Sequence, residues 1–414
     1  MALQGKTVLV GITGGIASAV CAYLLKKQGF RPIGIHVSFF DKDENLGPFQ
    51  DLIYNDLDGV KKVCDYLDIP FYAVNAVEQF KDTVIDPMVG RVLSGHSYNP
   101  LIYMHKIIVE VLVSKMSKFN ANLIATGHFA KVLKNQKSGN FELLTANDYQ
   151  FDQSHLLSLI DEKVYSLLYL PLSEIKYSEM EKISGLLKCD FRPLNKVTAK
   201  EVMAHPAMPK FVESRCSKDM LHQGNIYIYG SEAAIKEHLG IHHYFIGKNH
   251  LNLGDGERND DRYDEHFTVI NISPFKGAVY IKEINPVEKP HTVLKFKHLF
   301  LDHFHSSSEL DLTKPMTVYC LTDGMSDKMA GTLHFKTNQF VFLELSQELS
   351  SILPVGVQFI FYSRPRDKAK VIGSAQLTLM GHFDRDDFHQ LPKVSQGDND
   401  EENPPRPLFD KFQF

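Results

Sequence analysis

The chain has 414 residues, of which 43% are apolar and 23% charged, and its formal net charge at neutral pH is −5. This composition is ordinary for a globular protein with an ample core and roughly two to four domains. The slightly acidic balance excludes a basic field over the whole surface that would bind nucleic acid, although it leaves room for a local basic patch.

The cysteines and the first residues of the chain indicate the cellular compartment in which the protein is expected. The five cysteines, at positions 21, 64, 189, 216 and 320, are far apart and form no CxxC pair, so no disulfide framework is expected. No apolar stretch has the length of a membrane span, and the first residues lead directly into an expected strand without a signal peptide. We therefore expect a cytoplasmic protein with no membrane contact.

Residues 6–126 alternate between short apolar runs and amphipathic segments. In chain order the pattern predicts a strand at Lys6–Gly11, a helix at Ser18–Gln28, a strand at Arg31–Phe39, a helix at Leu57–Leu67, a strand at Phe71–Val74, a helix at Leu101–Phe119 and a strand at Ala121–Thr126. This alternation is typical of an α/β fold with a parallel sheet. Ligands bind at the carboxyl ends of the strands in such sheets, so the loop after Gly11 and the pair Gly127-His128 are expected to face one crevice.

The loop after the first strand has the composition of a phosphate-binding turn. It reads Gly11-Ile-Thr-Gly-Gly-Ile-Ala-Ser18. Glycines let a backbone approach an anion, and the N-terminus of the next helix points free N–H groups at it. The alternative is a tight turn that serves only the packing of strand on helix. His128 either contacts phosphate or RNA, or it is a structural histidine under the loop. The candidate nucleotide-binding residues are Gly11, Thr13, Gly14, Gly15, Ser18 and Gly127.

The second half of the chain changes character twice. Residues 206–280 are less regular and rich in His, Asn, Asp and Gly. From residue 285 short β-rich segments alternate with turns, which predicts a small barrel or sandwich. We therefore predict an α/β domain over 1–205, a central domain over 206–282 and a β-barrel over 283–382. The expected strands of the last domain are Thr292–Phe300, Met316–Leu321, Gly331–Thr337, Phe340–Leu345, Val357–Tyr362 and Ala369–Leu379.

Residues 383–414 form an acidic, proline-rich tail that is expected to be disordered. The tail ends in the apolar cluster Leu408–Phe414. This cluster is either an untethered terminus or a short peptide that docks on a protein partner.

Several segments, taken in order, resemble the bacterial tRNA-specific 2-thiouridylases. The glycine loop resembles their pyrophosphatase loop (PP-loop), and further similar segments are Val63–Val74, Asn99-Pro100, Ala125–Val132, Asp152–Ser154, Leu170–Glu174, His243–Gly254 and Gly356–Tyr362. The resemblance implies a parallel-sheet PP-loop domain of the adenine nucleotide alpha-hydrolase-like type, followed by a small central domain and a C-terminal β-barrel. Enzymes of that family activate a uridine of tRNA with ATP and replace its oxygen with sulfur carried on a cysteine.

The resemblance also implies ligand contacts for particular residues. Val37 matches a position whose backbone meets adenine, which adds it to the nucleotide-binding candidates. The candidates for contact with tRNA are Asn99, Pro100, His128, Asp152 and Gln153. For the last two, capping of a helix or loop is the alternative.

The sequence departs from the family where the family's chemistry is carried. Ala17 stands in place of an aspartate that helps hold the magnesium–phosphate assembly, and a methyl group offers no ligand atom for Mg²⁺. Leu101 replaces the aspartate beside the target base, and Met104 replaces the cysteine that carries the persulfide. A thioether cannot do this because the thiolate is the nucleophile. No cysteine occupies the position of the second thiol, and Cys216, just upstream, is the nearest candidate.

These substitutions together predict a divergent family member that keeps nucleotide binding, tRNA binding or both, and lacks thiolation by the standard cysteine persulfide. The alternative is an active ATP-dependent tRNA uridine 2-sulfurtransferase with a non-standard sulfur route. A second alternative comes from the loop alone, because Gly11–Ala17 is similar to the loop that binds the FMN phosphate in phosphopantothenoylcysteine decarboxylases. ATP is the expected ligand, and FMN is the lesser alternative.

Histidines are dense at His242-His243, His298, His303 and His305. They lack the HExxH or Cys–His spacing of a zinc site. The sequence therefore predicts no metal there.

Overall fold

The computed structural model describes most of the chain. The described residues are 5–42, 44–53, 57–187, 197–221, 223–249, 251, 267–283, 293–300, 314–322, 325, 327–337, 340–347 and 353–381, with the backbone alone at 293–300, 336–337, 340 and 379–381. The predicted tail 383–414, with Leu408–Phe414, lies outside them, as do His303 and His305.

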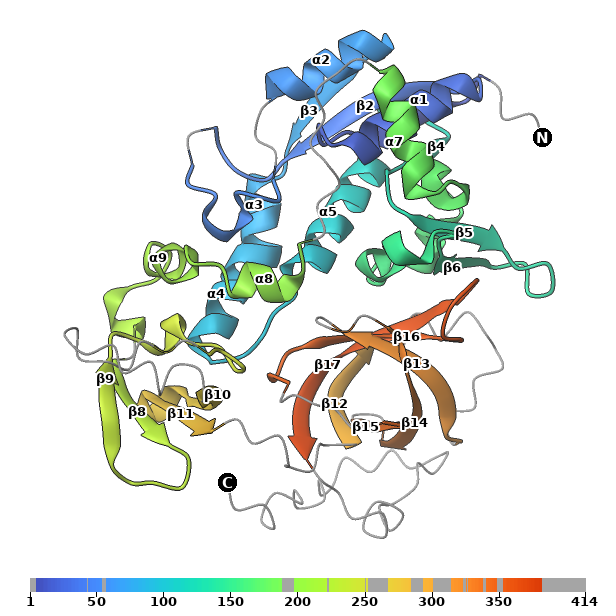
Figure 1. Cartoon of the computed structure of the whole chain (residues 1–414). Coiled ribbons are helices and arrows are strands. Elements are labelled where there is room, and N and C mark those ends of the chain that lie inside the picture. Colours follow the sequence, from blue (N-terminus) through green and yellow to red (C-terminus); the bar gives the residue numbers. More distant parts are fainter. Residues whose placement is uncertain are drawn as a thin grey trace, which may run out of the picture.

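A parallel sheet forms the first part of the fold (Figure 1). Its strands are β1 (Thr7–Gly11), β2 (Arg31–Ser38), β3 (Phe71–Asn75), β4 (Leu123–Ala125) and β7 (Leu168–Tyr169), in the order β3-β2-β1-β4-β7. Every neighbouring pair is parallel, which confirms the predicted α/β class. The strand order reverses between β1 and β4, and such a switch point is where open α/β sheets bind ligands.

Side chains of β1 alternate between the two faces of the sheet. Val8 and Val10 pack with helices α1 (Ile16–Lys27) and α2 (Leu57–Leu67) on one face. Leu9 packs with α5 (Pro100–Lys115) on the other face. All three side chains are 0% exposed, and burial of each contributes about 1.5–3 kcal/mol to stability. The period of two thus covers the sheet with helices on both faces.

The remaining elements up to Glu213 are short. The π-helical turn η2 joins α3 and α4 into one irregular helix, and β5 and β6 form a hairpin. The sequence pattern did not predict this hairpin or the two-residue strand β7. The bounds are η1 (Gly47–Phe49), α3 (Val77–Phe80), η2 (Lys81–Ile85), α4 (Asp86–Leu93), β5 (Ala130–Lys134), β6 (Phe141–Thr145), η3 (Tyr149–Phe151), η4 (Ser154–Leu157), α6 (Glu162–Tyr165), η5 (Pro171–Glu174), α7 (Tyr177–Leu186), α8 (Ala199–Met203) and α9 (Met208–Glu213).

Residues after α9 form a second sheet, whose strands the less regular sequence pattern over 206–280 did not predict. Its strands lie in the order β10-β11-β8-β9 around the buried side chains of Ile226, Val269 and Ile281. Each strand has five to seven residues, too few for the alternation to stand out among the polar residues between them. The bounds are η6 (Lys218–Met220), β8 (Gly224–Ile228), β9 (Ala234–His238), η7 (Ile241–His243), β10 (Phe267–Ser273), η8 (Pro274–Lys276) and β11 (Ala278–Glu283).

The last described sheet closes into a barrel in the order β12-β15-β14-β13-β16-β17, seen at the bottom of Figure 1. This decides between the predicted barrel and sandwich. Its core is apolar, with Val318, Leu343 and Phe359 each 0% exposed. The strands are β12 (Val293–Phe300), β13 (Met316–Thr322), β14 (Met329–Thr337), β15 (Phe340–Leu345), β16 (Gln358–Tyr362) and β17 (Val371–Gly381).

The barrel rests on the hairpin of the first part. The backbone N–H of Thr145, in β6, donates to Ala369 O at 3.0 Å, and Ala369 N donates back to Thr145 Oγ1 at 3.1 Å. The predicted domain limits at 205, 282 and 382 stay a prediction, and β11 runs one residue past the second of them. Among the helices that the structure describes, none has the length and apolar character needed to cross a membrane.

Candidate nucleotide site

A cleft of about 570 Å³ lies at the carboxyl ends of β1, β2 and β4. Its walls come from the loop after β1, the first turn of α1, the end of β2, one side of α5 and the turn after β4. This is the crevice expected from the sequence. The sequence candidates in its lining are Gly11, Thr13, Gly15, Ala17, Ser18, Val37, Leu101, Met104, Gly127, His128 and Gln153, whereas Gly14, Asn99, Pro100, Asp152 and Cys216 are not in it.

Ser18 holds the loop between β1 and α1. Its Oγ donates to Gly15 O at 2.9 Å and accepts from Thr13 N at 3.2 Å. Gly14 has a φ of +79°, in the left-handed region that favours glycine. Gly15 is the N-cap of α1. These residues fix the shape of the loop that leads into the first turn of α1.

The first turn of α1 faces the cleft without a charged side chain. Ile16, Ala17 and Ser18 line the cleft, and this turn contains no acidic residue. The unpaired N–H groups and positive dipole end of a helix attract anions. Among the described lining residues the one carboxylate is that of Asp51, whose side chain is 66% exposed and lies 3.9 Å from His205 Nε2. The helix end therefore offers hydrogen-bond donors, and Ala17 adds only a methyl group.

Gly127 brings the end of β4 against the same helix turn. A Cβ at this position would lie 2.6 Å from the carbonyl carbon of Ala17 and 2.8 Å from the backbone N of Ser18. Backbone atoms cannot move aside as a flexible side chain does. A glycine at 127 is therefore required for the two cleft walls to meet.

Helix α5 forms an apolar wall of the cleft. Leu101 is 6% exposed and Met104 is 7% exposed, and both line the cleft. Asn99 is the N-cap of this helix, and its Oδ1 accepts from the N–H groups of Leu101 at 3.1 Å and Ile102 at 3.3 Å. Pro100 is the first residue of α5, a position that needs no N–H donor. Asn99 and Pro100 thus start the helix that presents Leu101 and Met104.

Neutral histidines line the wall between β4 and α5. His128 Nδ1 lies 2.8 Å from Thr126 Oγ1, and His128 Nε2 lies 2.9 Å from His105 Nδ1. Burial and the neighbouring His155 lower the pKa of His105 to about 4. Burial, with His105 and His155 beside it, also lowers the pKa of His128 well below its usual value. At neutral pH both rings are therefore uncharged, and both nitrogens of His128 are engaged within the wall.

Asp152 and Gln153 hold the turn that carries these groups. Gln153 Oε1 accepts from Phe129 N at 3.0 Å, directly after His128. Asp152 accepts from Ala146 N at 2.9 Å and from Ser154 Oγ at 2.8 Å, and burial raises the pKa of its carboxyl group. These bonds favour the capping alternative for Asp152, while Gln153 also reaches the cleft.

The cysteines that the structure describes are poor nucleophiles. Cys21 and Cys64 are buried in the core, and burial raises the pKa of Cys64 to about 12. Cys216 is half-buried, and burial together with the charge of Glu213 raises its pKa. A thiol reacts as the thiolate, which a raised pKa disfavours. No described cysteine lines the cleft.

Sequence reasoning missed His36 and His105, which both line the cleft. His36 Nδ1 lies 3.0 Å from Ile12 O, at the start of the glycine loop. A signal existed for each, because His36 falls near the carboxyl end of a predicted strand and His105 follows Met104 directly. Neither forms a motif with its neighbours, so the pairing with the loop and with His128 appears only in three dimensions.

Comparison with known proteins gives the family. The family described as "tRNA methyl transferase HUP domain" matches residues 6–196. The chain is 29% identical over 246 residues to tRNA-specific 2-thiouridylase MnmA 1 of Clostridium tetani, covering 59% of this chain and 66% of that protein. It is 30% identical over 276 residues to tRNA-specific 2-thiouridylase MnmA of Malacoplasma penetrans, covering 62% and 71%. It is 28% identical over 309 residues to MnmA 2 of Clostridium botulinum, covering 73% and 82%.

Among solved structures, a 4-thiouridine synthetase–RNA complex with bound ATP aligns with 44% of the chain at 13% identity and a TM-score of 0.30. The sequence relatives are the stronger finding, because the Malacoplasma protein is matched over more than two thirds of its length. This chain therefore belongs to the tRNA-specific 2-thiouridylase family.

Proposed function

We propose that this protein is a divergent thiouridylase-family member that binds a nucleotide, with ATP as the first candidate, and engages tRNA, without thiolation through a cysteine persulfide. One observation carries the second half of the proposal. Ala17, Leu101 and Met104 all line the cleft, and the resemblance in sequence matches them to the family's magnesium-binding carboxylate, base-side carboxylate and sulfur-carrying thiol. Because such groups act together in one reaction, a protein that lacks all three is not expected to carry out thiolation by that route.

Binding of a nucleotide is supported by the start of α1. The uncharged first turn of this helix, with Ser18 and the two glycines, offers N–H groups to a phosphate. The volume of about 570 Å³ is that of a small-molecule site. Val37 and Phe39, at the end of β2, supply apolar surface on which a base or flavin ring would pack.

Magnesium fits this cleft poorly. Mg²⁺ prefers carboxylate, phosphate and water oxygens in an octahedral arrangement. Among the described lining residues the carboxylate of Asp51 is the one acidic ligand, and its side chain is largely exposed. We therefore expect phosphate binding that depends weakly on Mg²⁺.

The alternative of an active sulfurtransferase rests on Cys216. Its thiol lies outside the cleft lining, and its pKa is raised by burial and by the charge of Glu213. Both observations weigh against it as a sulfur carrier. The FMN alternative shares the phosphate contacts of α1 and differs in the ring that fills the rest of the cleft.

The binding test is a thermal-shift titration of purified protein with ATP, AMP and FMN, each with and without Mg²⁺. A ligand of the folded state raises the melting temperature by mass action. We expect a shift with ATP that survives removal of Mg²⁺, and a colourless preparation. A yellow preparation with flavin absorbance replaces ATP with FMN, and no shift with any of the three overturns nucleotide binding.

The activity test measures 2-thiouridine by mass spectrometry in tRNA from a bacterial strain that lacks its own thiouridylase and expresses this chain. We expect no 2-thiouridine, while an intact family enzyme expressed in the same strain restores it. Restoration by this chain would overturn the proposal, and its loss in a Cys216→Ser variant would then identify the thiol. Gel-shift titration with total tRNA tests RNA engagement separately.

A further inference from the structure

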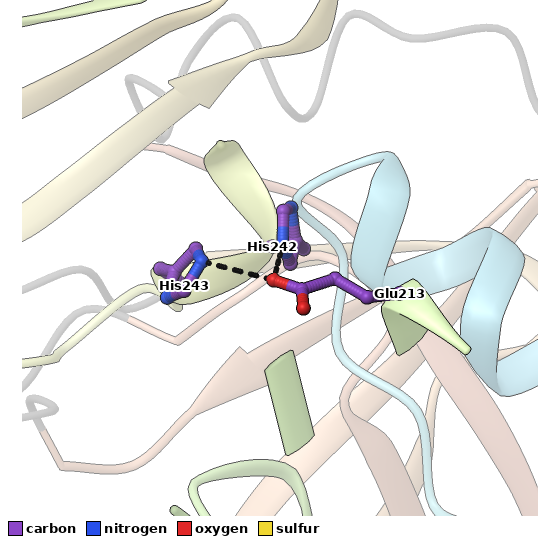
Figure 2. A group of neighbouring side chains, drawn as sticks. All are labelled: Glu213, His242 and His243. Atoms are coloured by element: carbon purple, nitrogen blue, oxygen red, sulfur yellow. Dashed lines mark hydrogen bonds and ion pairs between the residues drawn. The ribbon is translucent and has the colours of Figure 1, made fainter. Parts of the chain in front are cut away.

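A carboxylate and two imidazoles meet at the junction between α9 and the second sheet. Glu213 is the last residue of α9, and His242 and His243 belong to η7. His242 Nε2 lies 3.1 Å from Glu213 Oε1, and His243 Nε2 lies 3.5 Å from the same oxygen. Figure 2 shows a dashed line from each of the two rings to the same carboxylate oxygen of Glu213. None of the three residues lines the cleft described above.

We propose that Glu213, His242 and His243 bind a divalent transition-metal ion, Zn²⁺ in the first place. Two imidazole nitrogens and a carboxylate oxygen are a common protein ligand set for Zn²⁺. The three candidate ligand atoms all lie within 4.8 Å of one another. The sequence shows no metal motif here, because α9 and η7 are separated by the strands β8 and β9.

The spacing fits tetrahedral zinc. Bonds of about 2.0–2.1 Å from Zn²⁺ to nitrogen and oxygen give ligand-to-ligand edges of about 3.3 Å in a tetrahedron. The observed separations of 3.1 Å and 3.5 Å lie on either side of that value. Two of the three edges are therefore close to the tetrahedral value, and the two imidazoles lie within 4.8 Å of each other. Binding of an ion requires the Nε2 protons to leave and both rings to turn from the carboxylate oxygen toward the metal.

The His242 ring is built into the fold. Its side chain is 1% exposed, and its Nδ1 is buried without a hydrogen-bond partner among the described residues. A Cβ on Gly240 would lie 2.3 Å from Cε1 of this ring, so a glycine at 240 makes room for it. A buried imidazole whose tautomer is not fixed by a second partner can place its proton on Nδ1 and turn the Nε2 lone pair toward a metal.

The other two ligands leave one side of the site open. The side chains of Glu213 and His243 are 40% and 32% exposed. Three protein ligands with a solvent-facing fourth position accommodate a water molecule on zinc. The ion would also tie α9 to η7, so its binding is expected to stabilise the folded chain.

The decisive experiment is isothermal titration of metal-stripped, untagged full-length protein with Zn²⁺, and with Mg²⁺ as a hard-ion comparison. We expect one Zn²⁺ per chain, a higher melting temperature that a chelator reverses, and no binding of Mg²⁺. Glu213→Gln and His243→Asn should each weaken Zn²⁺ binding by about 100-fold or more, beyond the 10–100-fold typical of changes outside the first ligand sphere. Absence of stoichiometric Zn²⁺ binding would overturn the proposal.

The barrel supplies a matched control. His334 Nε2 lies 3.1 Å from Glu344 Oε2, a histidine–glutamate pair of the same separation as His242–Glu213. His334→Asn should leave the Zn²⁺ affinity unchanged, and so should Cys216→Ser. Equal affinity in wild type and in both site variants, or loss of binding in either control, overturns this ligand set. Circular dichroism of each variant separates loss of the site from loss of the fold.

Discussion

His128 Nε2 lies 2.9 Å from His105 Nδ1, and this one hydrogen bond joins the turn after β4 to the middle of α5. Only one of the two nitrogens carries the proton of the bond. The hydroxyl of Thr126 lies 2.8 Å from the other nitrogen of His128, and it can donate or accept a hydrogen bond according to which nitrogen carries the proton. The pair therefore closes the cleft wall in the neutral state and is broken when both rings are charged.

The first prediction is that stability falls in mild acid. The folded-state pKa of His105 is about 4 and that of His128 is also lowered, whereas an unfolded histidine has a pKa of about 6.5. The unfolded chain thus binds more protons between these values. The contribution of the two neutral rings to the free energy of unfolding is therefore fully present above pH 6.5. It is lost as the pH falls toward 4, with a slope of up to about 1.4 kcal/mol per pH unit for each histidine.

Urea unfolding at several pH values between 7 and 4 checks this. His105→Asn should show a shallower fall in the free energy of unfolding over that window, because one depressed histidine is gone. Equal slopes for the variant and the wild type would contradict the assignment.

The second prediction concerns Gly127. Gly127→Ala places a methyl group 2.6 Å from the carbonyl carbon of Ala17, and such overpacking against backbone costs about 1–3 kcal/mol. We expect a loss of stability of this size together with weaker nucleotide binding. The control is Gly185→Ala in α7, where nothing lies within 4 Å of the added Cβ; it should stabilise by about 0.5–1 kcal/mol. Comparable melting temperatures for the two variants would refute the proposed close approach.

Local sequence patterns were enough to predict much of the secondary structure. The strand over β1 could be predicted from its continuous apolar run, and the helix Leu57–Leu67 because its apolar residues repeat with the helical period. The hairpin β5–β6 could not, since its residues are half polar and its partner is the barrel. The second sheet could not be predicted either, because its pairing joins distant segments: β11 pairs in parallel with β8, far earlier in the chain.

Part of the candidate site could likewise be predicted from the local sequence, and part depends on how distant elements pack. The glycine loop could be recognised in the sequence because the backbone at Gly14 adopts a positive φ, which favours glycine. The pairing of His105 with His128 and of Glu213 with His242 depends on how distant elements pack. No local rule encodes either contact.

The third prediction separates a structural from an RNA-binding role for Asp152. Asp152→Ala removes the acceptor of the Ala146 N–H and leaves the Ser154 hydroxyl with Tyr362 Oη, at 3.3 Å, as its remaining partner among the described residues. Unsatisfied buried donors cost about 1–3 kcal/mol each. We expect a stability loss of at least that size in chemical unfolding. Asp161→Ala, which removes the N-cap of α6, should cost about 1 kcal/mol. A stable Asp152→Ala protein with weakened tRNA binding would instead favour direct RNA contact.

The fourth prediction tests the proposal that Ala17 stands where the family has a carboxylate. Ala17 lies in the first turn of α1 and lines the cleft. Ala17→Asp brings a negative charge to the phosphate site, so ATP binding should weaken without Mg²⁺ and recover when Mg²⁺ bridges carboxylate and phosphate. Wild-type affinity should change little with Mg²⁺. Ala17→Asn, which has nearly the same shape and no charge, should show no such recovery, and calorimetric titration with ATP measures all three proteins. Strong Mg²⁺ dependence in the wild type that disappears in Asp51→Asn would contradict this prediction and assign the binding of Mg²⁺ to Asp51.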